Sequence, residues 1–338
     1  MSNKEKISQS SIKNENTLAI FDEISRADGI SRADISERTG LSLMTVGKVA
    51  DTLTHEGIII QAKPATGSAG RRAGMLTLSE DYFILALDIS TPEFRAASMD
   101  LHLEPMDTVI YQYNTNLFPE DNLVIFFRET GTLLMKHLMS KKMVGTGICV
   151  PGEYDIENDT VISPKLKELA GLKISETMKK SIGFTPDTIM NSAEAAALSA
   201  ISELPSEKCG CTVSLNLGRD ICGSVAFDKS ILSRPSDFES LLCENGMTLG
   251  RNISEISDEE ELCRQIGSAL KPIISVLCPD SVFICSSERS FSEWFPSLLG
   301  KELKTPACEP EIIFENSKNY RSDMGLAQLI RSDMIKKL

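Results

Sequence analysis

Residues 16–77 read NTLAIFDEISRADGISRADISERTGLSLMTVGKVADTLTHEGIIIQAKPATGSAGRRAGMLT. Apolar side chains recur in them at helical spacing in three segments, with Asp28-Gly29 after the first and Thr39-Gly40 after the second. Glycine ends helices readily because it adopts the left-handed conformation at little cost. The stretch therefore predicts three short helices, with a tight turn between the second and the third.

N-cap signals precede the second and third predicted helices. Ser31 has Asp34 three residues later, a short-armed version of the capping box, and Ser42 precedes the third helix. Four apolar residues of the third helix fall at positions i, i+3, i+4 and i+7, namely Val46, Val49, Ala50 and Leu53. This spacing predicts one buried stripe along that helix.

The other face of the third helix carries side chains suited to contact DNA. They are Ser42, Leu43, Thr45, Lys48 and Thr52. Short hydroxyl groups near a helix N-terminus can donate to phosphates or base edges, and Lys48 supplies positive charge. The order of helices and turn is that of a helix-turn-helix. We expect Ser42, Leu43, Thr45 and Lys48 to bind DNA.

Two β-rich runs, residues 58–61 and 75–78, follow the third helix and flank a glycine-rich tip at residues 67–74. This pattern predicts the wing of a winged helix-turn-helix. Arg71 and Arg72 stand between glycines in the tip, where they can enter a narrow minor groove. The alternative for the tip is a solvated linker with incidental charges. The whole module could also serve protein contacts, but the placement of its basic residues favours DNA.

Charge is divided unevenly along the chain of 338 residues, whose formal net charge is −13. Residues 1–80 hold 10 Lys or Arg and 10 Asp or Glu, so the remaining residues carry the whole negative charge. A neutral module with a few well-placed cations can dock on phosphates while the acidic body is held away from DNA. The acidic sum therefore does not exclude a nucleic-acid partner.

The composition favours a cytoplasmic protein. No apolar run approaches the ~20 residues that span a membrane, and the polar N-terminus lacks the apolar core of a signal peptide. Nine cysteines without framework spacing indicate reduced thiols. Cys209 and Cys211 form a close pair, but no further Cys or His stands near enough in sequence to complete a zinc set. Buried thiols are favoured over a metal there.

Strand-like and helix-like segments alternate beyond residue 81, which predicts an α/β architecture in two lobes. The predicted strands are residues 83–89, 95–100, 144–150, 188–190, 212–217 and 281–285, and an alanine-rich helix follows at residues 193–198.

The order of these motifs resembles the ROK family (repressors, open reading frames and sugar kinases) over about residues 16–330. The helix-turn-helix and the SAGRRAG segment resemble the repressor part of the family. The stretches LALDISTPEFRAASMDL, GTGICVPG, NSAEAAALSA and LNLGRDICGSVAF resemble the kinase-like landmarks in order. The resemblance implies an actin-like ATPase (ribonuclease H-like) fold, a homodimer or tetramer, and binding of a double-stranded DNA operator that a sugar or sugar phosphate modulates.

The phosphate turns of the family are altered in this chain. Family kinases end the first strand with Asp-Ile-Gly-Gly-Thr, whereas residues 88–92 read DISTP, and proline removes a backbone donor. The second turn, residues 218–223, contains the added carboxylate of Asp220, which repels phosphate. Residues 286–287 are Ser-Ser where the family has Gly-Gly. These departures predict that the ATP site is lost.

The sugar site implied by the resemblance has also changed. Ser192 occupies the position of the catalytic aspartate, and an unactivated hydroxyl is too weak a base to deprotonate a sugar. Asn191 matches a sugar contact and Glu194 lies one turn further on. An N-cap and an exposed helix residue are equally good readings of these two. The family's zinc cluster is missing, since residues 233–250 offer a lone Cys243, so neither metal nor cofactor is expected.

The sequence thus predicts three parts: a disordered tail at residues 1–15, a winged helix-turn-helix at 16–79, and a ROK-type sugar-kinase-like domain at 80–338. The predicted function is a DNA-binding transcriptional regulator without enzyme activity, a repressor of carbohydrate-related genes. Its large domain would act in sensing or oligomerisation. Two alternatives stay open. The protein could be a divergent ROK sugar kinase, or a regulator that needs no ligand and whose large domain is only an oligomerisation or partner scaffold.

Overall fold

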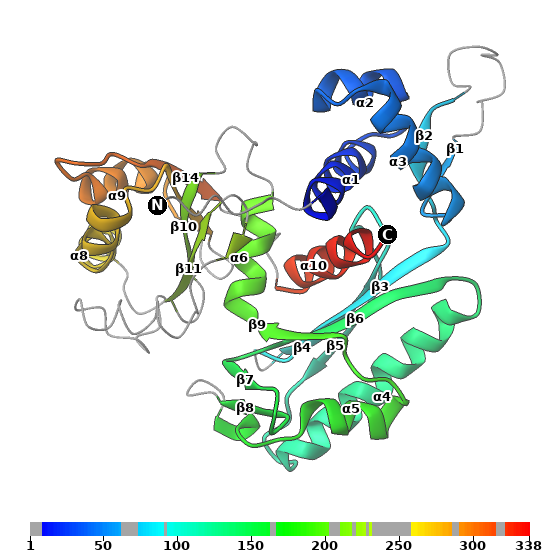
Figure 1. The fold of residues 1–338 in the computed structure, drawn as a ribbon. Coiled ribbons are helices and arrows are strands. Elements are labelled where there is room, and N and C mark those ends of the chain that lie inside the picture. The colour runs from blue at the N-terminus through cyan, green and yellow to red at the C-terminus, as the bar shows by residue number, and fades with distance from the viewer. Residues whose placement is uncertain are drawn as a thin grey trace, which may run out of the picture.

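The computed structural model describes residues 9–61, 74–90, 93–162, 167–202, 210–217, 221–227, 230–231, 258–285, 291–315 and 322–338. They form a small N-terminal module that lies beside two larger lobes (Figure 1).

The N-terminal module has the predicted three helices and two wing strands. Its elements are α1 (Gln9–Ser25), α2 (Arg32–Thr39), α3 (Leu43–His55), β1 (Ile59–Gln61) and β2 (Leu76–Leu78). The strands β1 and β2 pair antiparallel, so the predicted hairpin is confirmed. The tip between them, with Arg71 and Arg72, lies outside the described residues.

The predicted caps are confirmed. The Ser31 hydroxyl accepts from the Asp34 backbone N–H at 3.1 Å, and the Ser42 hydroxyl accepts from the Thr45 backbone N–H at 3.1 Å. Gly40 ends α2 with a φ of 69°, the left-handed conformation that favours glycine. These local signals set the end of α2 and the starts of α2 and α3.

Replacing Ser42 with Ala should lower the free energy of unfolding by about 1 kcal/mol, because the Thr45 N–H loses its acceptor. Equilibrium urea unfolding followed by circular dichroism measures the change. Ser42→Asp keeps an acceptor at the cap and serves as the matched control. Equal losses in the two variants would count against the cap.

The predicted disordered tail at residues 1–15 is wrong for residues 9–15, which belong to α1, while residues 1–8 lie outside the described residues. The helix begins at Gln9 and ends at Ser25, before the predicted stop at Asp28-Gly29. The Thr17 hydroxyl donates to the Lys13 carbonyl at 2.8 Å, and the Lys13 ammonium donates to the Leu338 carbonyl at 3.0 Å. A contact across the whole length of the chain thus supports this end of α1, and local sequence cannot reveal it.

The first sheet has the order β5-β4-β3-β6-β9, with β4 antiparallel to β3 and β5, and with β6 and β9 parallel to β3. Its strands are β3 (Tyr82–Asp88), β4 (Glu93–Met99), β5 (Pro105–Gln112), β6 (Lys142–Val150) and β9 (Thr188–Asn191). A small hairpin, β7 (Glu153–Asp155) with β8 (Thr160–Ile162), and a short 3-10 helix at Lys167–Leu169 follow β6.

The second sheet repeats this arrangement, with the order β12-β11-β10-β13-β14. Its strands are β10 (Cys211–Leu217), β11 (Ile221–Phe227), β12 (Ser230–Ile231), β13 (Ser281–Cys285) and β14 (Glu311–Glu315). In both sheets an antiparallel hairpin on the central strand is followed by two parallel strands on its other side. The predicted two-lobed α/β architecture is confirmed.

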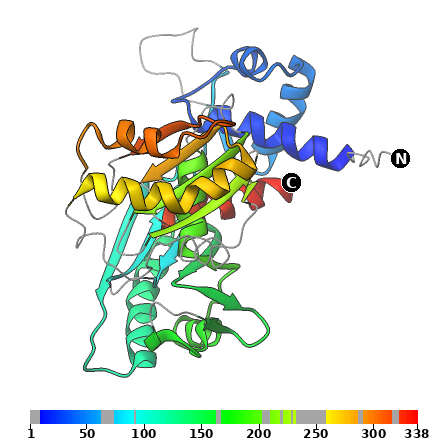
Figure 2. The ribbon, with the colours of Figure 1, turned by 90° about the vertical axis from the view of Figure 1, so that its left-hand side faces the viewer.

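Helices cover both sheets. Helices α4 (Pro119–Leu138) and α5 (Ile174–Ile182) bury one face of the first sheet. Helices α8 (Glu259–Leu277) and α9 (Phe295–Leu303) bury one face of the second, where α8 lies across the strands in Figure 2. Helices α6 (Ser192–Ser202) and α10 (Ser322–Lys336) pack against each other between the sheets (Figure 1). No described helix has both the length and the apolar character that a membrane crossing needs.

The N-terminal module and the large domain share one apolar core. Leu101 and Ile335 of the large domain are buried together with Ile20, Phe21 and Ile24 of α1. The Tyr82 hydroxyl also donates to the Glu56 carbonyl at the end of α3, at 2.7 Å. The module is therefore docked on the large domain through packed side chains as well as through the chain connection.

Candidate functional site

Helix α3 presents one buried and one exposed face. Val46, Ala50 and Leu53 are fully buried, as predicted, whereas Val49 is only partly buried because it borders a cavity. On the opposite face, Leu43 is 60% exposed and the Lys48 side chain is also exposed. The buried stripe anchors α3, so its outer face is held rigidly toward solvent.

The predicted DNA-binding residues lie together at the N-terminal half of α3. The hydroxyls of Ser42 and Thr45 form a hydrogen bond of 2.9 Å, with Ser42 exposed and Thr45 half-buried. Together with Leu43 and Lys48 they place hydroxyls, an apolar group and an ammonium group around a helix N-terminus. Such an end favours anions, phosphate among them.

Two further residues of this surface escaped the sequence reasoning. Met44 is 71% exposed, and Asp51 forms an ion pair of 2.6 Å with Arg32 at the start of α2. Met44, Lys48 and Asp51 follow the spacing i, i+4, i+7 on the side opposite the buried stripe, a signal that the sequence did contain. The exposed Arg32–Asp51 pair is worth at most about 1 kcal/mol.

The second candidate site lies where three parallel strands of the first sheet end. Asp88 ends β3, Val150 ends β6 and Asn191 ends β9, and the pairings Asp88↔Cys149 and Val150↔Asn191 bring these ends to one edge. Ser192 starts α6 directly after Asn191. Carboxyl ends of parallel strands commonly carry ligand sites in α/β folds.

Asp88 is half-buried at this edge, and its carboxylate accepts hydrogen bonds from two sides. Its carboxylate accepts from the Ser90 backbone N–H at 2.7 Å and from the hydroxyls of Ser90 and Ser322. Burial raises the pKa of Asp88, although these hydrogen bonds oppose the rise. The neighbouring Asp323 pairs with Arg95 at 3.1 Å. The start of α10 is thereby fastened to the end of β3.

The structure brings the three predicted sugar-site residues together. Asn191, Ser192 and Glu194 are all half-buried and occupy the β9–α6 junction, with Glu194 in the first turn of α6. Asn191 stands just before α6, where an N-cap residue would stand. Their roles toward a ligand stay predictions.

Several predicted features lie outside the described residues. These are residues 91–92 and 218–220 of the two altered phosphate turns, residues 286–287 where the family has Gly-Gly, and the segment 233–250 at the family's zinc position. Within the described part of the chain, no group of three or more His, Cys, Asp and Glu side chains is arranged to hold a metal ion. The predicted loss of the ATP and zinc sites stays a prediction.

Comparisons with known proteins assign the N-terminal module. A family described as winged helix-turn-helix DNA-binding matches residues 13–60. The chain is 27% identical over 163 residues to the xylose repressor of Bacillus spizizenii, and 26% identical over 163 residues to that of Bacillus subtilis. Each match covers 46% of this chain and 41% of the relative, so less than half of each relative is matched.

Solved structures assign the fold of the whole chain. A ROK family transcriptional regulator, a homolog of the Escherichia coli MLC protein, matches with a TM-score of 0.67 at 14% identity, over 96% of this chain and 98% of that one. A ROK hexokinase from Thermus thermophilus matches with a TM-score of 0.52 at 13% identity, over 72% and 96% of the two chains. The resemblance seen in the sequence and the actin-like fold are confirmed. The chain joins a winged helix-turn-helix DNA-binding domain to the fold shared by ROK family regulators and sugar kinases.

Proposed function

We propose that the protein is a transcriptional repressor of carbohydrate-related genes. The observation that carries the proposal is the outer face of α3, where Ser42, Leu43, Thr45 and Lys48 surround a capped helix N-terminus on a rigid support. This face enters the major groove of an operator, and Arg71 and Arg72 reach the adjacent minor groove. The similarity to xylose repressors supports this assignment.

The large domain senses a sugar in this proposal and transfers no phosphate. Ser192 stands where the resemblance places a catalytic aspartate, and a hydroxyl has too little basicity to activate a sugar. Asn191 and Glu194 contact the sugar or sugar phosphate. The fold likeness to a ROK hexokinase keeps a kinase as the second candidate. Incubation of the purified protein with ATP, Mg²⁺ and hexoses or pentoses decides between the two, since sugar phosphate formation would establish the kinase.

The remaining parts of the proposal concern assembly and location. The protein acts in the cytoplasm as a homodimer or tetramer, so its operator has two half-sites whose spacing follows the geometry of the assembly. It needs neither zinc nor a nucleotide cofactor.

Operator selection from random DNA, followed by release with a sugar panel that begins with xylose, tests the function. The expected result is one enriched two-part sequence whose binding a sugar weakens. Enrichment without any sugar response would favour the scaffold alternative for the large domain. No enrichment at all would overturn the proposal.

Replacing Lys48 with Gln should reduce the salt dependence of operator binding by about one unit of log-log slope, because one phosphate contact is lost. Fluorescence anisotropy across a salt series measures the slope. Lys180→Gln is the matched control, since Lys180 is an exposed lysine paired with Glu176 on α5, far from α3 in the fold. An unchanged slope in Lys48→Gln would remove Lys48 from the DNA surface.

A further inference from the structure

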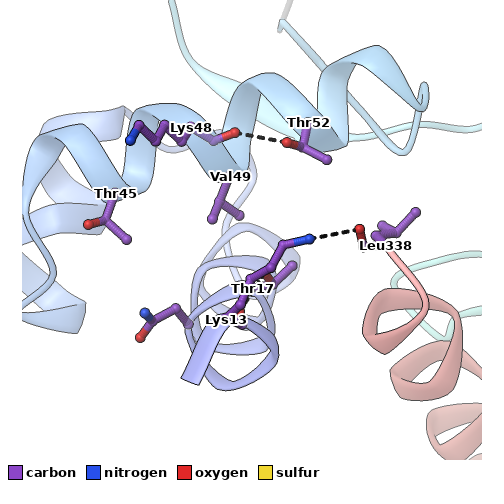
Figure 3. A pocket seen from close by; sticks show the side chains of 8 residues that line it. Lys13, Thr17, Thr45, Lys48, Val49, Thr52 and Leu338 are labelled. Carbon is purple, nitrogen blue, oxygen red and sulfur yellow. Dashed lines mark hydrogen bonds between the residues drawn. The ribbon is translucent and has the colours of Figure 1, made fainter. Parts of the chain in front are cut away.

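A cavity of about 400 Å³ lies between α1, α3 and the last residue of the chain (Figure 3). Its walls include Lys13 and Thr17 from α1, Thr45 and Lys48 from α3, and Leu338 beyond α10. The volume falls in the range of small-molecule sites, which is about 300–1,000 Å³. The cavity is separate from the β9–α6 junction, because the two share no residue.

The lining favours a small anion with an apolar body. Both charged side chains in the lining are lysines, Lys13 and Lys48. The side chain of Val49 points into the space between the two helices in Figure 3, and aliphatic portions of the neighbouring side chains add apolar surface. The Lys13 ammonium donates to the Leu338 carbonyl, which uses one of its three donors. A carboxylate can accept the others while its hydrocarbon part lies on Val49.

We propose that this cavity is a second effector site, which takes a small organic carboxylate with an apolar body. A carboxylate in this cavity contacts α3, the helix proposed to bind DNA, and also Leu338, which follows α10. Because Lys48 lines the cavity and also belongs to the proposed DNA surface, a bound anion competes with DNA phosphates for its charge. The carboxylate therefore weakens operator binding.

This regulatory effect rests on the proposed function, whereas binding of the carboxylate does not. Titration calorimetry on the full chain uses hexanoate and benzoate as probes, with acetate as the probe that lacks an apolar body. We expect saturable binding of hexanoate or benzoate and at least tenfold weaker binding of acetate. No saturable binding of either larger probe, or acetate binding of equal strength, would overturn the site.

Two variants localise the binding. Lys13→Gln removes one cation without touching the DNA surface, and Val49→Trp fills the cavity from α3. Both should weaken hexanoate or benzoate binding at least tenfold, while Lys180→Gln leaves it unchanged. Circular dichroism checks that each variant folds. If Val49→Trp does not fold, Lys13→Gln alone localises the binding. Unchanged affinity in folded Lys13→Gln would place the bound probe elsewhere.

Measurements of operator binding distinguish a failure of the effector site from a failure of the proposed function. The larger carboxylate should raise the Kd for the selected operator at least fivefold in the wild-type chain, and by less than twofold in Lys13→Gln. An equal effect in both would contradict regulation through the cavity. If the chain binds no operator even without the carboxylate, the proposed function fails, and the calorimetric result still decides whether the cavity binds the anion.

Discussion

Replacing Gly325 with Ala should lower the free energy of unfolding by about 3 kcal/mol or more, a loss at the upper end of overpacking effects. Gly325 lies in α10 where this helix crosses α6. A Cβ atom there would stand 1.7 Å from the Ala195 carbonyl oxygen, 2.6 Å from the carbonyl carbon and 3.0 Å from the Ser199 backbone nitrogen. These are backbone atoms, so no side-chain rotation relieves the clash, and the two helices must move apart.

Gly47→Ala is the matched control for this prediction. Gly47 is also a helical glycine, in α3, but an added Cβ would meet no atom within 4 Å. Alanine should therefore raise stability there by up to about 1 kcal/mol, because it restricts the unfolded chain and favours the helix. Urea unfolding followed by circular dichroism compares the two variants. A Gly325→Ala protein as stable as wild type would show that α6 and α10 do not pack this closely.

The loss of stability expected for Gly325→Ala should also affect function, because α10 connects the two candidate sites. Its first residue, Ser322, bonds Asp88 at the strand ends, and Ile335 near its last turn lies in the core of the N-terminal module. Helix α6 begins with Ser192 beside Asn191. If α6 and α10 move apart, both the predicted sugar-site residues and the packing of the N-terminal module against α10 should therefore be disturbed.

Much of the fold was predictable from the sequence because its signals are local. The caps Ser31 and Ser42, the buried residues of α3 and the strand runs depend on neighbours a few positions away. The repeated order of the two sheets was not predictable from these signals, since it is set by pairing between distant strands. Likewise, the contact of α1 with Leu338 through Lys13 joins residues that are 325 positions apart.

The candidate sites likewise contain some features that local sequence signals predict and others that depend on residues far apart in the sequence. The exposed face of α3 follows from helical periodicity, which also places the exposed Met44 on it. The hydrogen bond from the Ser322 hydroxyl to the Asp88 carboxylate joins residues that are 234 positions apart in the sequence, so periodicity could not reveal it. The cavity beside Val49 is also a product of tertiary packing, because it needs α1, α3 and Leu338 at once.

Arg331→Leu should lower the free energy of unfolding by about 2–4 kcal/mol, through an unsatisfied buried carbonyl and lost packing. The Arg331 guanidinium is buried, donates to the Leu101 carbonyl at 2.7 Å and lies 5.4 Å from the centre of the Phe21 ring. Burial lowers the pKa of Arg331, and the nearby carboxylates of Asp22 and Asp100 oppose that shift. The residue thus joins α10 to α1 by a cation–π contact, and to the turn after β4 by a hydrogen bond.

Two further variants separate this role from the mere removal of a charge. Arg331→Lys keeps the charge but lacks the planar group that stacks on Phe21, so it should recover little stability. Arg264→Leu removes an exposed arginine that pairs with Glu261 on its own helix, and it should change stability by less than about 1 kcal/mol. Hydrogen exchange then locates the effect, because α1 amides should exchange faster in Arg331→Leu while those of α8 keep their wild-type rates. Equal acceleration in both helices would mean that Arg331 supports the whole fold, and that the docking of the DNA-binding module depends on the shared apolar core instead.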